Sequence, residues 1–278
     1  LTVGVLYLVV CSIGYDDKVA VGVALSAGIG TNMWAYSQTF FREPLVSLFI
    51  LLAVLIIQWC SHRSLLGWLI GILSAIGFLS LAFLTKFSAF MIFPAIAVFA
   101  LPHFGFLDHK RMRQLSIGLL ILQIIGLFIF TIFEPFSDIV TKLATRFNEA
   151  PDLIGYALRV YILSPGGSIW GTSPVLLLAI VGGILLLRRN QHRVVWTVWL
   201  AFTGYTVGHA LVTGGDWFGG QSWPPRFLVP VIPVLMIATA PVLQTIFEKK
   251  QKLLAMMWLA LLGYGVWIQF SGVSLMWY

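Results

Sequence analysis

Three parts of this sequence carry acids, bases and rings that could do chemistry. The first runs from Tyr36 to Leu45 and places Arg42 and Glu43 directly before Pro44. Proline suits the first turn of a helix, where the positive end of the helix dipole favours a carboxylate. A carboxylate in apolar surroundings is costly unless it is paired, bound to a metal or open to water. Glu43 could therefore belong to a site, and the alternative is a plain ion pair with Arg42 at a helix start.

The second part is Lys86, which stands between two strongly apolar stretches. A lysine in such a place can lay its stem along apolar surface while the ammonium group reaches water, which would be a structural role. Its compact charge would equally suit the phosphate of an anionic lipid. The residue alone leaves both interpretations open.

The third part runs from Gly214 to Leu228 and combines glycines with Trp217, Trp223 and Arg226. Tryptophan rings beside flexible glycines could stack on a sugar or a lipid headgroup. The guanidinium could bind a phosphate through two N–H groups. A belt of aromatic residues at a membrane surface explains the two tryptophans equally well.

His209 lies two turns before Asp216 and could bind a metal together with Glu43 or relay a proton. The alternative is a histidine satisfied at the end of a helix. A divalent metal is the one cofactor that these residues suggest, and the sequence names no other. It contains no Walker A loop, no dinucleotide GxGxxG motif and no HExxH zinc helix, so nucleotide hydrolysis is not expected.

The elements that position these residues must be membrane helices. Hydrophobic residues make up 59% of the 278 positions and charged residues only 10%, whereas a soluble domain carries roughly 25% charged side chains. So few charges could not cover a surface exposed to water. In a soluble protein the formal net charge of +7 would suggest nucleic acid, but here we expect no nucleic-acid partner. The placement of the basic residues about the bilayer carries the information instead.

Uncharged runs near the length of a membrane span, about 20 residues, recur along the chain. We predict an all-α polytopic membrane protein with about ten transmembrane helices, over residues 1–14, 19–36, 45–60, 65–84, 88–101, 115–133, 175–187, 194–212, 228–247 and 253–272. The run from 65 to 101 would be about 55 Å long as one helix, so it must break, and Thr85-Lys86-Phe87-Ser88 is its one polar place. The helices over 88–101 and 175–187 are short for full spans and are expected to lie partly inside the bundle.

Successive loops between membrane spans lie on alternate sides of the bilayer, and this divides the 17 basic residues into two sets. Eleven fall on one side: Lys18, Arg63, Lys110, Arg111, Arg113, Arg188, Arg189, Arg193, Lys249, Lys250 and Lys252. The positive-inside rule makes that side cytoplasmic. The outward side, which would be the periplasm, the cell exterior or a lumen, then holds Glu43, Lys86, Asp216 and Arg226. In a prokaryote the membrane would be the plasma membrane.

One loop is long, from Glu134 to Pro174, and we predict it on the outward side within a single transmembrane domain, 1–278. Ser137 can cap an amphipathic helix lying on the outer leaflet. Pro151 and Asp152 begin a second amphipathic piece, and Ser164-Pro165-Gly166-Gly167 ends it. The chain opens at Leu1, without Met and inside an apolar stretch, so we expect an N-terminal part to be missing.

Four motifs follow one another in a familiar order. They are Tyr36-Ser37 with Phe41-Arg42-Glu43-Pro44-Leu45; Leu84-Thr85-Lys86 with Pro94; Leu163-Ser164-Pro165-Gly166-Gly167-Ser168 with Ser173-Pro174; and Trp223-Pro224-Pro225-Arg226-Phe227-Leu228 with Pro230 and Pro233. This series resembles the lipid-carrier-dependent glycosyltransferases of the C-type membrane superfamily, relatives of protein O-mannosyltransferases and of the aminoarabinose transferase of lipid A. The resemblance covers most of the chain.

The resemblance implies a membrane glycosyltransferase with its site on the non-cytoplasmic face. The donor would be a sugar on a polyprenyl phosphate such as undecaprenyl or dolichyl phosphate, transferred with inversion to an acceptor hydroxyl or amine. Glu43 matches an acidic position that binds a metal or positions the acceptor, and Lys86 and Arg226 match basic residues near the donor phosphate. The substrate-binding residues would be Tyr36, Arg42, Lys86, Trp217, Trp223 and Arg226.

Two features of the chain depart from that family. The family's catalytic base lies in the first outward loop, which this chain lacks, so we expect the base in the missing N-terminal part or an inactive chain. Pro224-Pro225 stands where many relatives have Gly-Pro. The rival interpretation, from another class, is a non-catalytic lipid-linked sugar flippase or transporter, or a membrane binding subunit.

Overall fold

The computed structural model describes residues 1–39, 41–60, 65–100, 114, 151–219, 223 and 225–275. Every regular element within these ranges is helical, and they contain no strand. The all-α class predicted from the sequence is therefore confirmed for the described part of the chain.

In the described part of the chain, five helical segments are long and apolar enough to cross a membrane, by length and composition: Glu43–Cys60, Leu66–Thr85, His192–Asp216, Arg226–Lys249 and Lys252–Ser274. They correspond to α4 (Glu43–Cys60), α5 (Leu65–Thr85), α12 (His192–Thr213) with η4 (Gly214–Asp216), η5 (Arg226–Val231) with α13 (Ile232–Ile237) and α14 (Ala240–Lys249), and α15 (Lys252–Leu275). These five match five of the ten predicted spans. Such segments support the interpretation that the chain is a membrane protein.

Three further predicted spans coincide with shorter apolar segments, Thr2–Ser12, Phe87–Ala100 and Pro174–Arg188. They comprise α1 (Thr2–Ser12), η1 (Phe87–Ile92) with α6 (Phe93–Ala100), and η3 (Pro174–Leu176) with α11 (Leu177–Arg188). The last two are the segments that we expected to be too short for complete spans. The predicted span over 115–133 lies outside the described residues.

The predicted span over 19–36 is interrupted. Helix α2 (Asp17–Gly30) stops where Thr31 takes an extended conformation, and the short helix α3 (Met33–Ser37) follows. The backbone N–H of Asn32 donates to Ser173 Oγ at 3.0 Å, and this hydrogen bond comes from a residue far along the chain. A tertiary contact thus replaces helical hydrogen bonding at this point.

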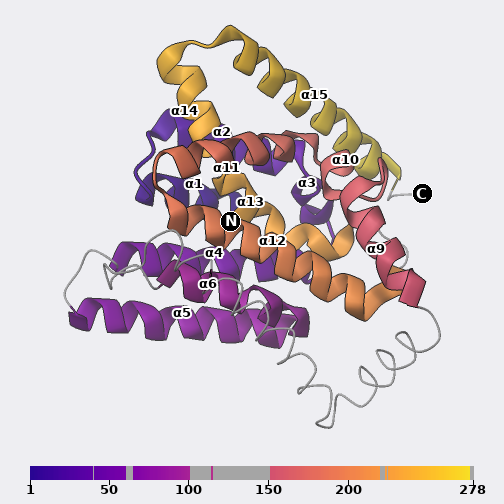
Figure 1. Ribbon diagram of the computed structural model, residues 1–278, viewed down its shortest axis with the longest axis horizontal. Helices are drawn as coiled ribbons and strands as arrows, with labels where there is room; N and C mark the ends of the chain where they lie inside the picture. The colour runs from indigo at the N-terminus through magenta and orange to yellow at the C-terminus, as the bar shows by residue number, and fades with distance from the viewer. Residues whose placement is uncertain are drawn as a thin grey trace.

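The break predicted at Thr85-Lys86-Phe87-Ser88 is confirmed. Helix α5 ends at Thr85, Lys86 is extended (φ −153°, ψ 117°), and the 3₁₀ helix η1 begins at Phe87. Helices α4 and α5 pack side by side, and Figure 1 shows them as neighbouring purple helices at one edge. The break returns the chain toward the bundle and leaves Lys86 near the start of α4.

The predicted long loop is described only from residue 151. Helix α9 (Pro151–Leu163) forms where the second amphipathic piece was predicted, and it ends before Ser164 as expected. After the turn, Ser168 caps α10 (Ile169–Thr172) by accepting a hydrogen bond from the Gly171 N–H at 3.0 Å. The helix predicted after Ser137 lies outside the described residues.

The centre of the bundle is formed by α12 and α13, with α15 and α5 at the edges (Figure 1). In the apolar 18-residue window of the 226–249 segment 89% of the positions are buried, against 11% in the corresponding window of the 252–274 segment. The face of α15 that points away from the bundle exposes large apolar side chains such as Leu253, Trp267 and Phe270. A helix with that face is suited to contact lipid.

Hydrogen bonds define which helix ends lie together. Near the end of α4, Gln58 donates to the Ser12 carbonyl at the end of α1 at 3.0 Å. Tyr15, just beyond α1, donates to Gln191 before α12 at 3.3 Å. Glu43 begins α4 and Gln58 lies near its other end, so Glu43 lies about 22 Å along the helix from this contact, at the opposite end of the bundle.

Candidate functional site

Glu43 is the first residue of α4, and its side chain is completely buried. Pro44 follows it in the first turn, so the local prediction for this helix start is confirmed. The Ser47 hydroxyl, one turn later, donates to the Glu43 carbonyl at 3.0 Å. The helix start therefore holds the carboxylate in a fixed place at one end of the bundle.

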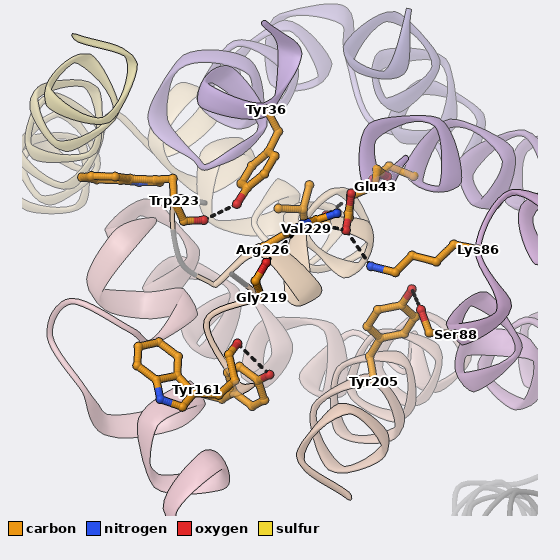
Figure 2. Close-up of polar contacts among 12 residues, drawn as sticks. Tyr36, Glu43, Lys86, Ser88, Tyr161, Tyr205, Gly219, Trp223, Arg226 and Val229 are labelled. Carbon is orange, nitrogen blue, oxygen red and sulfur yellow. Dashed lines mark hydrogen bonds and ion pairs between the residues drawn. The ribbon is translucent and has the colours of Figure 1, made fainter. Parts of the chain in front are cut away.

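Two cations from remote parts of the chain share one oxygen of this carboxylate. Lys86 Nζ lies 2.6 Å and Arg226 Nε 2.8 Å from Glu43 Oε1, and Figure 2 shows both side chains pointing toward Glu43. Within the described residues, Oε2 has no hydrogen-bond partner. The Lys86 and Arg226 side chains are 19% and 23% exposed, against 0% for Glu43. The accessible part of the cluster is therefore cationic.

Arg226 is held by the two segments on either side of it. It begins η5 after the extended residue Pro225, its Nη1 donates to the Gly219 carbonyl at 3.1 Å, and its guanidinium lies 3.8 Å above the Phe41 ring. Gly219 has φ +79°, a left-handed conformation in which a side chain would be strained. Backbone geometry and a ring thus aim the Arg226 Nε at Glu43.

Lys86 is positioned by the helix break and by a stack of rings. Its ammonium lies 4.7 Å from the centre of the Phe227 ring. The His209 ring stacks on the Phe227 ring, with 4.9 Å between the ring centres and 12° between the ring planes. Burial lowers the pKa of the Lys86 amine below its ordinary value, and the nearby Glu43 carboxylate opposes that shift.

His209 is buried, and within the described residues neither ring nitrogen has a hydrogen-bond partner. Tyr205, one turn earlier in α12, lies 5.0 Å away between ring centres, and its hydroxyl is 3.4 Å from Ser88 Oγ. The predicted site histidine therefore adjoins the charged cluster through Phe227, without an ion pair to Glu43.

Tyr36 and Trp223 are joined to each other beside the cluster. The Tyr36 hydroxyl donates to the Trp223 carbonyl (Figure 2), and its ring lies 5.7 Å from that of Phe41. The Trp223 ring packs on α15, where a β-carbon on Gly272 would come within 2.7 Å of it. Both residues thus support the chain that carries Arg226.

Trp217 lies in a neighbouring cluster, and Arg42 lies outside the ion pairs that the described residues make with Glu43. The Trp217 carbonyl accepts a hydrogen bond from the buried Tyr161 hydroxyl at 3.0 Å, and its ring packs against Gly167. Arg42 is exposed. The ion pairs that Glu43 makes with described residues join it to Lys86 and Arg226, so the plain helix-start pair with Arg42 is replaced by contacts from distant segments.

Phe41, Phe227, Gly219 and Tyr161 were not singled out from the sequence. Phe41 and Phe227 stand next to predicted charged residues, which is the only local signal for them. That a ring lies over a cation depends on how the segments meet. A glycine near an arginine likewise does not indicate which carbonyl the guanidinium will bind.

The divalent metal stays a prediction. No group of three or more His, Cys, Asp or Glu side chains that could hold a metal ion occurs in the described ranges. The proposed ligands, Glu43 and His209, are committed in part to Lys86, Arg226 and Phe227. Glu43 Oε2 and the His209 ring nitrogens are the atoms that would have to bind the metal ion.

No family model matches the chain, and no curated protein or solved structure is found to be similar to it. The fold and the site therefore define a class only: a chain whose described part is all-helical, with five helices there that could cross a membrane and a buried carboxylate beneath two cations.

Proposed function

We propose that the chain is a membrane glycosyltransferase that moves a sugar from a polyprenyl-phosphate-linked donor to an acceptor on the non-cytoplasmic face. The observation that supports this proposal most is the arrangement of charge in the cluster, with the carboxylate buried and the two cations partly exposed. Glu43 is buried, and Lys86 and Arg226 cover it with partly exposed cationic groups. One carboxylate and two cations leave a net charge of +1, which suits a phosphate group.

The reaction makes one bond and breaks another. An acceptor oxygen or nitrogen attacks the sugar's anomeric carbon while the bond to the phosphate oxygen breaks, so negative charge grows on the leaving phosphate. Lys86 and Arg226 would stabilise that charge, which is the kind of electrostatic help that lowers such barriers most. Glu43 would hold the two cations close together despite their mutual repulsion.

Glu43 itself is poorly suited to be the base. Two cations lie within 2.8 Å of its Oε1, and charge-assisted hydrogen bonds of this kind favour the ionised form over proton uptake. In this proposal the acceptor's proton goes to a base outside the described residues. Glu43 is then a positioning residue for Lys86 and Arg226.

The same observation favours one rival function. Glu43 is the one carboxylate that the ion pairs of the described residues place in this cluster. Recognition of a phosphate requires no base. A flippase or transporter for a lipid-linked sugar, or a membrane binding subunit, would therefore fit the same charge arrangement.

The two functions are separated by product analysis. The purified full-length protein is reconstituted in liposomes with labelled polyprenyl-phosphate sugars and candidate acceptors, and products are identified by mass spectrometry. Lys86→Met and Arg226→Gln are each expected to lower transfer at least about tenfold, the scale of one lost transition-state contact. Arg159→Gln, which removes an exposed cation of α9, serves as the control and should match the parent chain.

Donor binding without product, lost in Lys86→Met and Arg226→Gln, would favour the rival. If neither binding nor transfer responds to these two substitutions, the charged cluster only supports the fold and the proposal is wrong.

A further inference from the structure

The end of the bundle opposite Glu43 carries a second concentration of charge. It consists of five exposed cations at the ends of three helices, which we call the basic end: Arg188, Arg189, Lys249, Lys250 and Lys252. Helix α11 packs against α14, and the Arg189 guanidinium donates to Gln244 Oε1 in α14. This contact brings residues some 60 positions apart in sequence into one surface.

Few carboxylates balance these cations. Glu248 lies among them, and its Oε1 accepts a hydrogen bond from Gln244 Nε2 at 2.6 Å. The start of α2, which packs against α14, adds Asp16, Asp17 and Lys18. The exposed charged side chains named here, six cations and three carboxylates of the described residues, sum to a charge of +3.

The folded chain explains only part of this arrangement. Arg188 and Lys249 are in the last turns of α11 and α14, where the negative end of the helix dipole favours a cation. Lys252, in contrast, begins α15, where the positive end of the dipole disfavours one. Lys250 stands between α14 and α15 in a left-handed conformation, φ +49°. An anion from outside the chain would offset the unfavourable placement of the Lys252 charge.

Apolar surface continues directly from the basic end. Leu187, next to Arg188, and Phe247, two positions before Lys249, are exposed, and Leu253 at the start of α15 is 73% exposed. Cations directly beyond exposed apolar side chains match the boundary between the hydrocarbon and headgroup layers of a bilayer. A soluble anion would not account for the apolar surface beside it.

We infer that the basic end binds the phosphate groups of anionic phospholipids in the leaflet opposite the Glu43 cluster. The contact is electrostatic, between several Lys and Arg side chains and several headgroups. It would anchor the ends of α11, α14 and α15 at one membrane surface. This inference needs neither a sugar donor nor an acceptor, so it stands or fails separately from the proposed glycosyl transfer.

The test compares lipids that differ only in headgroup charge. The full chain is reconstituted in phosphatidylcholine bilayers, and its association with spin-labelled phosphatidylglycerol is measured relative to spin-labelled phosphatidylcholine. We expect a preference for phosphatidylglycerol that weakens as salt is raised. The triple variant Lys249→Gln, Lys250→Gln, Lys252→Gln should lower it about fivefold or more.

Two matched variants make the result specific. Glu248→Gln removes the carboxylate next to Lys249 in the sequence, keeps an oxygen for Gln244, and should strengthen the preference. Arg159→Gln removes an exposed cation on α9, away from the basic end, and should leave the preference unchanged. Because Glu248→Gln changes the charge in the opposite direction, the test holds even if the triple variant proves unstable.

Three results would overturn the inference. The first is a preference that survives the triple variant or ignores Glu248→Gln. The second is an equal loss in Arg159→Gln, which would reveal only an effect of net charge. The third is displacement of phosphatidylglycerol by micromolar inorganic pyrophosphate, which would indicate a site for a soluble anion instead.

Discussion

Glu43 is paired with two cations, so loss of one cation and loss of the carboxylate should affect the stability of the protein differently. Removing Lys86 leaves Glu43 paired with Arg226 at 2.8 Å. Removing the charge of Glu43 leaves two cations facing each other beside Phe227 and Phe41 with no carboxylate between them. An unpaired, partly buried charge costs about 3 kcal/mol or more.

We therefore predict that Glu43→Gln destabilises the chain by about 3 kcal/mol and that Lys86→Met costs clearly less. Reversible unfolding of the purified protein in mixed micelles measures both. In the double variant, loss of Lys86 should recover part of the cost of Glu43→Gln, because one of the two facing cations is gone. Strictly additive effects would show that the three groups do not act as one cluster.

At the scale of elements, α15 depends on close packing and a few polar contacts. Gly265 approaches α2 so closely that a β-carbon there would lie 2.5 Å from the Gly30 carbonyl oxygen. One turn further, Gln269 Nε2 donates to Asn32 Oδ1 at 3.0 Å. Lipid offers helices no hydrophobic reason to associate, so small residues and hydrogen bonds of this kind hold a peripheral membrane helix.

This packing predicts opposite outcomes for two glycines of the same helix. Gly265→Ala must push α15 away from the Gly30 carbonyl and should cost about 1–3 kcal/mol. Gly263→Ala meets nothing within 4 Å and should be neutral or slightly stabilising. Unfolding midpoints in detergent measure both, and equal shifts would mean that α15 does not pack on α2 at Gly265.

The sequence anticipated several element boundaries, and the reasons are local. Glu43-Pro44 starts α4 because proline and a carboxylate both suit a helix start, and Thr85-Lys86 ends α5 because it is the polar interruption in a long apolar run. The span over 19–36 was predicted without its interruption. Asn32 is held by Ser173 from a distant segment, and no periodicity within α2 signals that contact.

At the scale of the whole molecule, the contacts place the Glu43 cluster and the basic end at opposite ends of the bundle. Gln58 at the far end of α4 bonds to Ser12, and Tyr15 bonds to Gln191 beside the basic end. If the bundle crosses a bilayer, these ends must face opposite compartments. The positive-inside rule then predicts that the basic end faces the cytoplasm.

Cysteine labelling tests this orientation. In a variant without Cys11 and Cys60, single cysteines at the exposed positions Ser37 and Gln251 should react with a membrane-impermeant maleimide from opposite sides of the cell membrane. Gln251→Cys is expected to react only after the cytoplasmic side is opened, and Ser37→Cys in intact cells. Labelling of both from the same side would contradict the arrangement.

The sequence by itself determined the helical class, most candidate spans and the residue types of the site. Apolar runs, prolines and isolated charges act through local hydrogen bonding and burial, so they can be interpreted without knowing the fold. Only the tertiary structure decided that Lys86 and Arg226, 43 and 183 positions from Glu43, share one of its oxygens. Such a contact depends on how helices pack and where each one breaks, and these are properties of the whole bundle that no single segment carries.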